Sequence, residues 1–233
     1  MKIYIDRQKV NARAQAANLA SVGGLILLLA SVVVPLFLPT WTTVASILLI
    51  LGAGGAMIGI YFANCWVRKP RPEDSLNKAL KSFDDHYHLY HYPASLPCDH
   101  VLLTPAGVIG MEVVNLSGFF SYRNGRWKEA MTMGRALRYI VEERVSDPVT
   151  LAQALTDELK RRFEKELGED ISFPIKALTV FTHPATELEI EGVSSFPACK
   201  IEKLRKQAAF NAGRLEPQTF EKVSSFLERI TLP

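Results

Sequence analysis

The chain divides into one long apolar segment and a longer stretch in which apolar and polar residues alternate. No Asp, Glu, Lys, Arg or His occurs from Ala14 through Val67, a run of 54 residues. A helix needs about 20 apolar residues to cross a bilayer, so this run is long enough for two crossings. The pattern predicts membrane helices over Leu19–Leu38 and Val44–Phe62, with a turn at Pro39–Thr42. We therefore expect a two-helix transmembrane hairpin.

A cleaved signal peptide is the alternative interpretation of an apolar N-terminal run. It would need an apolar core of about 7–15 residues followed by a small-residue cleavage site, and this run is longer and is followed at once by a second one. Basic residues flank both outer ends of the run, and the loop between the predicted helices carries no charge. Because basic flanks favour the cytoplasmic side, we predict a multi-pass membrane protein with two spans and both termini in the cytoplasm.

The second predicted membrane helix carries a stripe of small residues. Gly55, Gly59 and Ala63 recur at intervals of four, and small residues at this spacing let another helix approach closely. Two uses are open. The stripe packs against Gly23 and Gly24 of the first helix, or it supports a homodimer or contact with another membrane protein.

Charge is distributed unevenly along the chain. The whole sequence holds 27 Lys and Arg against 24 Asp and Glu, a net charge of +3, but residues 72–233 hold 20 basic and 23 acidic residues. The positive excess therefore lies beside the apolar run, which argues against a strongly basic nucleic-acid-binding domain. The predicted order is a basic cytoplasmic N-terminal segment (1–17), the hairpin (18–66), a basic linker (67–71) and a cytoplasmic domain (72–233).

The domain reads as several short strands followed by alternating helices and strands. The predicted strands are 87–92, 99–104, 108–114, 119–123, 126–128, 175–181 and 196–199. The predicted helices are a short one around 76–83, a long one at 148–167, a short one at 200–208 and a last one at 217–230. Asn124-Gly125 between two strands is a strong hairpin signal. This order predicts an α/β layer fold.

The ends of the long helix are marked by residue types that favour helix termini. Asp147 suits the N-cap, Pro148 the first helical position and Gly168 the C-terminal cap. We therefore expect this helix to begin at Pro148.

Two carboxylates are predicted to oppose each other in the hairpin around Thr104-Pro105-Ala106-Gly107. If Thr104 pairs with Gly107, Asp99 lies directly across from Glu112 on the same face of the sheet. Two like charges on an otherwise apolar face are unfavourable unless a cation lies between them, and Mg²⁺ prefers one or two carboxylates with water and phosphate oxygens. The alternatives are a one-residue slip of the register, which separates the two acids, or a solvated strand end.

Three stretches of the domain carry motifs of a known protein family. They are DHVLLTPAGVIGMEVVNLSG from Asp99 to Gly118, NGRW ending at Trp127, and VFTHPATELEIEG from Val180 to Gly192. Through these stretches, residues 72–206 resemble the NERD (nuclease-related) domain, a branch of the restriction-endonuclease-like PD-(D/E)xK superfamily. The resemblance implies a restriction-endonuclease-like mixed sheet flanked by helices, here preceded by the transmembrane hairpin.

The resemblance also implies roles for individual residues. Asp99 and Glu112 correspond to metal ligands, Glu73 to a third acid, and Gln153 to a helper residue on the long helix. The implied cofactor is a divalent cation such as Mg²⁺, and the implied partner is DNA or RNA.

One position departs from the resembled family. Its pattern is an acid, one residue, then a Lys that orients or activates the attacking water, whereas this chain reads Glu112-Val113-Val114. Val114 is predicted on the same face as Glu112, and Lys128 is the nearest candidate for a relocated lysine. Loss of a positioned acid–base group typically costs about 10²–10⁴-fold in rate.

We therefore predict a membrane-anchored NERD-domain protein with a degenerate nuclease-like site. It would be a binding or interaction module whose phosphodiesterase activity is lost or weakened, with metal binding retained. Two alternatives remain open: an active Mg²⁺-dependent nuclease with a relocated basic residue, and a membrane scaffold with no nucleic-acid role.

Overall fold

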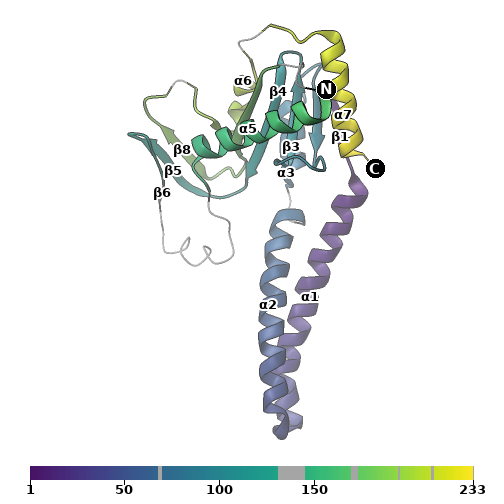
Figure 1. Cartoon of the computed structure of the whole chain (residues 1–233). Coiled ribbons are helices and arrows are strands. Elements are labelled where there is room, and N and C mark those ends of the chain that lie inside the picture. Colours follow the sequence, from purple (N-terminus) through teal and green to yellow (C-terminus); the bar gives the residue numbers. More distant parts are fainter. Residues whose placement is uncertain (68–69, 131–144, 169–172, 194, 211–212, 233) are drawn as a thin grey trace. The chain divides into compact units, whose positions relative to one another are not determined.

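The structure is a computed structural model that describes residues 1–67, 70–130, 145–168, 173–193, 195–210 and 213–232. The chain forms two compact units. One unit is a pair of long helices, and the other is a mixed α/β domain (Figure 1).

The helical unit is the predicted hairpin. Helix α1 spans Arg7–Phe37 and α2 spans Thr42–Trp66, with a 3-10 turn, η1, at Pro39–Trp41 between them. Both helices are long and apolar enough to cross a membrane. Helix α1 begins well before the predicted Leu19, because the alanine-rich sequence that precedes this residue also favours a helix.

The small-residue stripe is used inside the hairpin. A Cβ on Gly24 would lie 2.4 Å from the backbone nitrogen of Ala56, and one on Gly59 would lie 2.4 Å from that of Ser21. These positions accept only glycine without a shift of the partner backbone. A Cβ on Gly54, by contrast, would meet nothing within 4 Å. The predicted packing of the stripe against the first helix is therefore present at Gly24 but not at Gly23, where a Cβ would meet nothing within 4 Å, and the homodimer stays a prediction.

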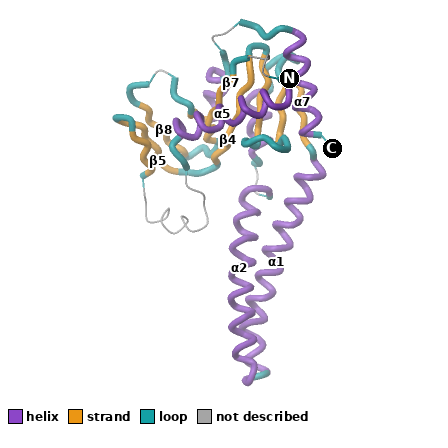
Figure 2. Tube along the Cα trace, in the orientation of Figure 1, coloured by secondary structure: helices purple, strands orange, loops and turns teal. Residues whose placement is uncertain are grey.

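The α/β domain is built on a six-stranded mixed sheet (Figure 2). The strands in spatial order are β1 (Lys2–Ile5), β2 (His88–His91), β3 (His100–Thr104), β4 (Gly107–Val114), β7 (Ile175–Phe181) and β9 (Ala198–Lys200). Strands β2, β3 and β4 form an antiparallel meander, whereas β1, β7 and β9 each run parallel to the neighbouring strand. The buried strands β3 and β7 are rich in apolar residues because both of their faces are covered.

A smaller three-stranded sheet follows the meander. Its order is β6 (Arg126–Glu129), β5 (Gly118–Arg123) and β8 (Thr186–Ile190). Asn124 and Gly125 between β5 and β6 both have positive φ, at 50° and 73°, as a two-residue type I′ hairpin requires. The hairpin predicted from Asn124-Gly125 is confirmed.

Helices cover the two faces of the large sheet. On one face lies α3 (Pro72–Leu80), together with η2 (Ile201–Lys203) and α6 (Leu204–Gln207); on the other lie α5 (Pro148–Leu167) and α7 (Pro217–Thr231). Helix α5 begins at the predicted Pro148, and the Asp147 carboxylate accepts a hydrogen bond from the Val149 amide at 3.0 Å. The sheet is mixed and flanked by helices, and the two apolar helices precede all of its strands but β1 in the sequence. The predicted fold class is therefore confirmed.

Strand β1 has no counterpart in the sequence prediction, which placed it in a basic N-terminal segment. It is the edge strand of the large sheet and runs parallel to β2, with Tyr4 opposite Tyr90 and their rings stacked at 4.7 Å. Four residues beside charged neighbours carry too short a pattern to predict a strand. The consequence is that the chain leaves the sheet after β1, forms the hairpin, and returns to the same domain at α3.

Candidate functional site

The predicted register of the β3–β4 hairpin is present. Thr104 pairs with Gly107, and the ladder continues to His100 opposite Met111. Glu112 lies one residue beyond this ladder on β4, and by alternation it shares the face of Gly110, which α5 covers. Asp99 is an exposed residue directly before β3, so its position across from Glu112 stays a prediction.

A buried thiol lies within the electrostatic influence of the two carboxylates. Burial first, and the negative charges of Glu112 and Asp99 after it, raise the pKa of the Cys98 thiol to about 12. A Cβ on Gly110, in the middle of β4, would lie 3.2 Å from the Cys98 sulfur and 2.6 Å from Leu159 of α5. The absence of a side chain at Gly110 thus leaves room for Cys98 beside the acids.

Glu73 approaches from a different side. It lies in the first turn of α3, whose Leu76 and Leu80 pack against the opposite face of the sheet from α5. The Glu73 side chain is buried, with 4% of its surface exposed, and it accepts a hydrogen bond from the Tyr92 hydroxyl at 2.8 Å. Gln153 is an exposed residue in the second turn of α5, next to the buried Ala152.

Val114 stands at the sequence position where the resembled family has its lysine. Its side chain packs against a cluster of aromatic residues. It pairs with Phe181 across β4 and β7 and packs against a buried group that includes Phe120 and Phe196. Lys128 is exposed on β6. Since its neighbour Trp127 packs into the same aromatic cluster, alternation directs Lys128 to the other face of the small sheet.

A buried polar network near the acids was not predicted from the sequence. The Nδ1 atoms of His91 and His100 lie 2.9 Å apart, and His91 Nε2 lies 3.0 Å from Oδ1 of Asn77 on α3. The ring of Tyr92 lies 5.0 Å from that of His100. The only signal in the sequence was the presence of polar residues inside otherwise apolar strands.

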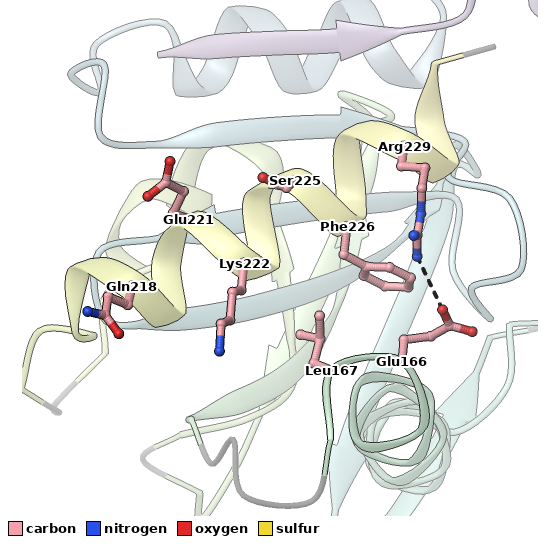
Figure 3. A pocket seen from close by; sticks show the side chains of 8 residues that line it. All are labelled: Glu166, Leu167, Gln218, Glu221, Lys222, Ser225, Phe226 and Arg229. Carbon is pink, nitrogen blue, oxygen red and sulfur yellow. Dashed lines mark hydrogen bonds and ion pairs between the residues drawn. The ribbon is translucent and has the colours of Figure 1, made fainter.

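A separate hollow of about 590 Å³ lies between α5 and α7 (Figure 3). It has charged walls and an apolar floor formed by Leu167 and Phe226, and an ion pair of 3.3 Å between Arg229 and Glu166 spans it. None of the predicted site residues lines it. The hollow is therefore distinct from the acid pair.

The donor chemistry of the acid pair suits a hard divalent cation. Within the described ranges, no three His, Cys, Asp or Glu side chains are grouped as a complete metal site. Mg²⁺ does not need such a group, because it binds through one or two carboxylates and completes its shell with water and phosphate oxygens. The predicted pair of Asp99 and Glu112 would supply that smaller donor set.

The mixed sheet and the helices on both of its faces define an α/β domain. Residues 71–182 match the NERD family, the nuclease-related domain. The match runs from the residue before α3 to the residue after β7, so the resemblance predicted from the sequence is confirmed for this part of the chain. No curated protein and no solved structure matches the chain.

Proposed function

We propose that this protein is a membrane-anchored NERD-domain protein whose nuclease-like site has lost its catalytic base and now acts as a binding or interaction module. The observation that carries the proposal is the position of Val114. It stands two residues after Glu112, where the PD-(D/E)xK pattern has lysine, and it is packed against Phe181. A branched aliphatic side chain neither orients a water molecule nor accepts its proton.

Two lysines of the domain are poor substitutes for the missing group. Lys128 lies on the face of the small sheet that is turned away from the aromatic cluster around Val114. Lys176 is held on the α3 side of the large sheet, where its ammonium donates to the carbonyls of Gln207 and Ala209, both at 2.7 Å. This placement favours a degenerate site over an active site with a relocated lysine.

In this proposal Asp99 and Glu112 hold a divalent cation such as Mg²⁺, while Glu73, which lies on α3 and is bonded to Tyr92, is not needed as a ligand. When bound, the cation would act as a Lewis acid that polarises a phosphate oxygen. The chain's own acids orient it and neutralise part of its charge. The site would then bind a phosphodiester of DNA or RNA without efficient cleavage, because Val114 leaves the attacking water unactivated.

The proposal includes a cytoplasmic domain and two membrane spans. Strand β1 precedes α1, and the rest of its sheet follows α2, so both ends of the hairpin leave the bilayer on one side. Arg7, Lys9 and Arg13 begin α1, and Arg71 follows α2. Basic residues at these positions favour the cytoplasmic side.

Cleavage assays on the full chain in lipid nanodiscs test the degenerate site. With Mg²⁺ or Mn²⁺ and DNA or RNA substrates, we expect little or no cleavage by the natural sequence. Val114→Lys should raise the rate by about 10²-fold or more. The matched control is Val113→Lys, because Val113 packs on the opposite face and a lysine there should not raise the rate.

Cleavage by the natural sequence that disappears in both Asp99→Asn and Glu112→Gln would overturn the degenerate site and favour the active nuclease. Thermal unfolding of each variant separates a loss of the site from a loss of the fold. Labelling of single cysteines placed at Arg7 and in the η1 turn, with a membrane-impermeant reagent on intact cells and on inverted vesicles, tests the orientation. Labelling at Arg7 from outside intact cells would contradict it.

A further inference from the structure

The positive charge of the α/β domain is concentrated on one of its two helical layers. Residues 72–83 and 200–210, which contain α3, η2 and α6, hold six basic and three acidic residues. The rest of residues 72–233 holds 14 basic and 20 acidic residues. One of the three acids in the first group, Glu73, is buried and accepts a hydrogen bond from Tyr92. A domain with an acidic excess therefore presents a positive face where α3 and α6 cover the sheet.

This basic face consists of five exposed side chains: Lys78, Lys81, Lys203, Arg205 and Lys206. Apolar packing brings the two helices that carry them together, because Leu76 and Leu80 of α3 and Leu204 of α6 belong to one buried cluster. The Arg205 guanidinium lies 5.8 Å from the centre of the Phe83 ring, just after α3. The cations of α3 and α6 thus form one continuous surface.

The charge of the basic face is not offset by neighbouring acids. Among the residues that the structure describes, none of the five cations forms an ion pair, although Asp74 and Glu202 are exposed on the same elements. On the opposite layer, α5 carries a similar basic run, but there Lys160, Arg161 and Arg162 each pair with a glutamate of the same helix. The basic face therefore keeps its charge for an external anionic partner.

Short connections hold this domain close to the ends of the hairpin. A single residue, Asp6, separates β1 from α1, and residues 67–71 separate α2 from α3. Five residues span at most about 18 Å when they are fully extended. If the hairpin spans a bilayer, lipid headgroups are therefore always within reach of the domain.

This tether favours a bilayer over a free polyanion as the partner. A nucleic acid in solution loses translational and rotational freedom when it binds, whereas the bilayer is already held by the hairpin, so that a weak attraction is sufficient. Each Lys or Arg near an anionic membrane surface favours association about fivefold. Five such residues on one face act together. A nucleic acid would meet the same face without the tether and against the acidic excess of the rest of the domain.

We propose that the basic face of α3 and α6 docks on anionic phospholipid headgroups of the bilayer that the hairpin spans. The inference rests on the membrane anchorage in the proposed function, and it does not depend on a cation at the acid pair. Because the attraction is electrostatic, docking requires anionic lipid and weakens with salt. The consequence is that the lipid composition of the bilayer sets the orientation of the domain.

The test is the reactivity of individual lysines of the full chain in nanodiscs, measured by mass spectrometry after brief labelling with a water-soluble amine reagent. One set of discs holds phosphatidylcholine alone, and the other holds phosphatidylcholine mixed with phosphatidylglycerol. The four lysines of the basic face should react about threefold or more slowly in the anionic discs, and high salt should remove this protection. Lys165 and Lys222, which are exposed on α5 and α7, are the controls and should react equally in both.

Charge reversal tests the same surface independently. Lys81→Glu combined with Arg205→Glu should abolish the protection of the remaining lysines on the basic face. The matched control, Lys165→Glu combined with Lys222→Glu, makes the same change of charge on the opposite layer and should leave the protection intact. Thermal unfolding shows whether each variant is folded. Equal reactivity of the basic-face lysines in the two kinds of disc would overturn the inference, as would equal protection of the control lysines.

Two further measurements separate docking from the proposed anchorage and from nucleic-acid binding. If alkaline carbonate extracts the natural chain from membranes, the anchorage is wrong and docking is overturned with it. If the chain resists extraction and its lysines react equally in both discs, only docking is overturned. Addition of duplex DNA or RNA to the phosphatidylcholine discs tests the other partner. Protection of the four lysines by nucleic acid but not by anionic lipid would overturn the inference.

Discussion

His91 and His100 face each other across β2 and β3, with their Nδ1 atoms 2.9 Å apart. Asn77 Oδ1 can only accept, so the proton on His91 lies on Nε2. His91 Nδ1 then accepts, and His100 Nδ1 donates. The pair cannot stay bonded when both rings are charged, since two imidazolium rings would place two donors against each other.

Because of this histidine pair, we expect the folded protein to lose stability in mild acid. Burial lowers the pKa of His91 to about 3, and burial lowers the pKa of His100 well below its usual value, with the nearby His91 adding to the effect. The unfolded chain takes up these protons near pH 6.5, whereas the folded chain does not. The histidines therefore have no effect on stability above about pH 6.5, and stability falls as the pH drops from there toward 3.

Each such group contributes about 1.4 kcal/mol of lost stability per pH unit in that window. Denaturant unfolding of the full chain between pH 7.5 and 4.5 measures the slope. His100→Gln should reduce the slope, while His86→Gln should not, because His86 is exposed outside the strands. An unchanged slope in His100→Gln would contradict the assignment.

Strand β1 should contribute to the stability of the domain although it precedes the hairpin. The Tyr4 ring stacks on Tyr90, and Tyr4→Ala removes that contact from the sheet edge. We expect a loss of about 2 kcal/mol in the free energy of unfolding, less than for a fully buried aromatic residue. Ile3→Ala on the same strand, where 45% of the side chain is exposed, should cost less than half of this. Chemical denaturation followed by tyrosine and tryptophan fluorescence makes the comparison, and equal losses would speak against β1 as a structural strand.

The close approach of the two long apolar helices predicts that a single added methyl group will change their packing. Gly59→Ala places a Cβ 2.4 Å from the Ser21 backbone and should force the helices apart at a cost of about 1–3 kcal/mol. Gly54→Ala makes the same chemical change where nothing lies within 4 Å, and it should be neutral. Disulfide formation between cysteines placed on α1 and α2 reports the separation. Equal crosslinking in both variants would argue against glycine packing at Gly59.

The N-cap of α5 gives a further prediction. Asp147→Ala removes the acceptor for the Val149 amide, and loss of such a cap typically costs about 1 kcal/mol. Asp157→Ala lies on the exposed surface of the same helix and should change the free energy of unfolding by less than 0.5 kcal/mol, about the usual limit for surface substitutions. A cost at Asp147 no greater than that at Asp157 would show that the cap is not needed.

The local sequence pattern was sufficient to predict several helices and strands of this protein. The apolar run predicted both helices of the hairpin because about 20 apolar residues are enough to mark a span. The register of β3 and β4 followed from the four-residue turn at Thr104–Gly107, and the start of α5 followed from Asp147 and Pro148. In each case the deciding residues are neighbours in the chain.

The candidate site was predicted only in part, because some of its contacts join residues that are far apart in the chain. The register of the hairpin that carries Glu112 could be derived from its turn, whereas the relation of Asp99 to Glu112 stays a prediction because Asp99 precedes β3. The hydroxyl contact of Tyr92 with Glu73 joins residues from different elements, and it depends on a φ of 57° that nothing in the sequence around Tyr92 indicated. The parallel pairing of β1 with β2 likewise crosses the whole hairpin.

The sequence by itself determined the two long apolar helices, the register of the β3–β4 hairpin and the presence of valine at position 114, because these depend on residue type and short spacing. The tertiary structure alone decided that β1 completes the sheet, that Val114 packs into an aromatic cluster and that Tyr92 bonds Glu73. Those contacts join segments far apart in the chain. They form only when burial of apolar surface brings the segments together, and no local pattern encodes that step.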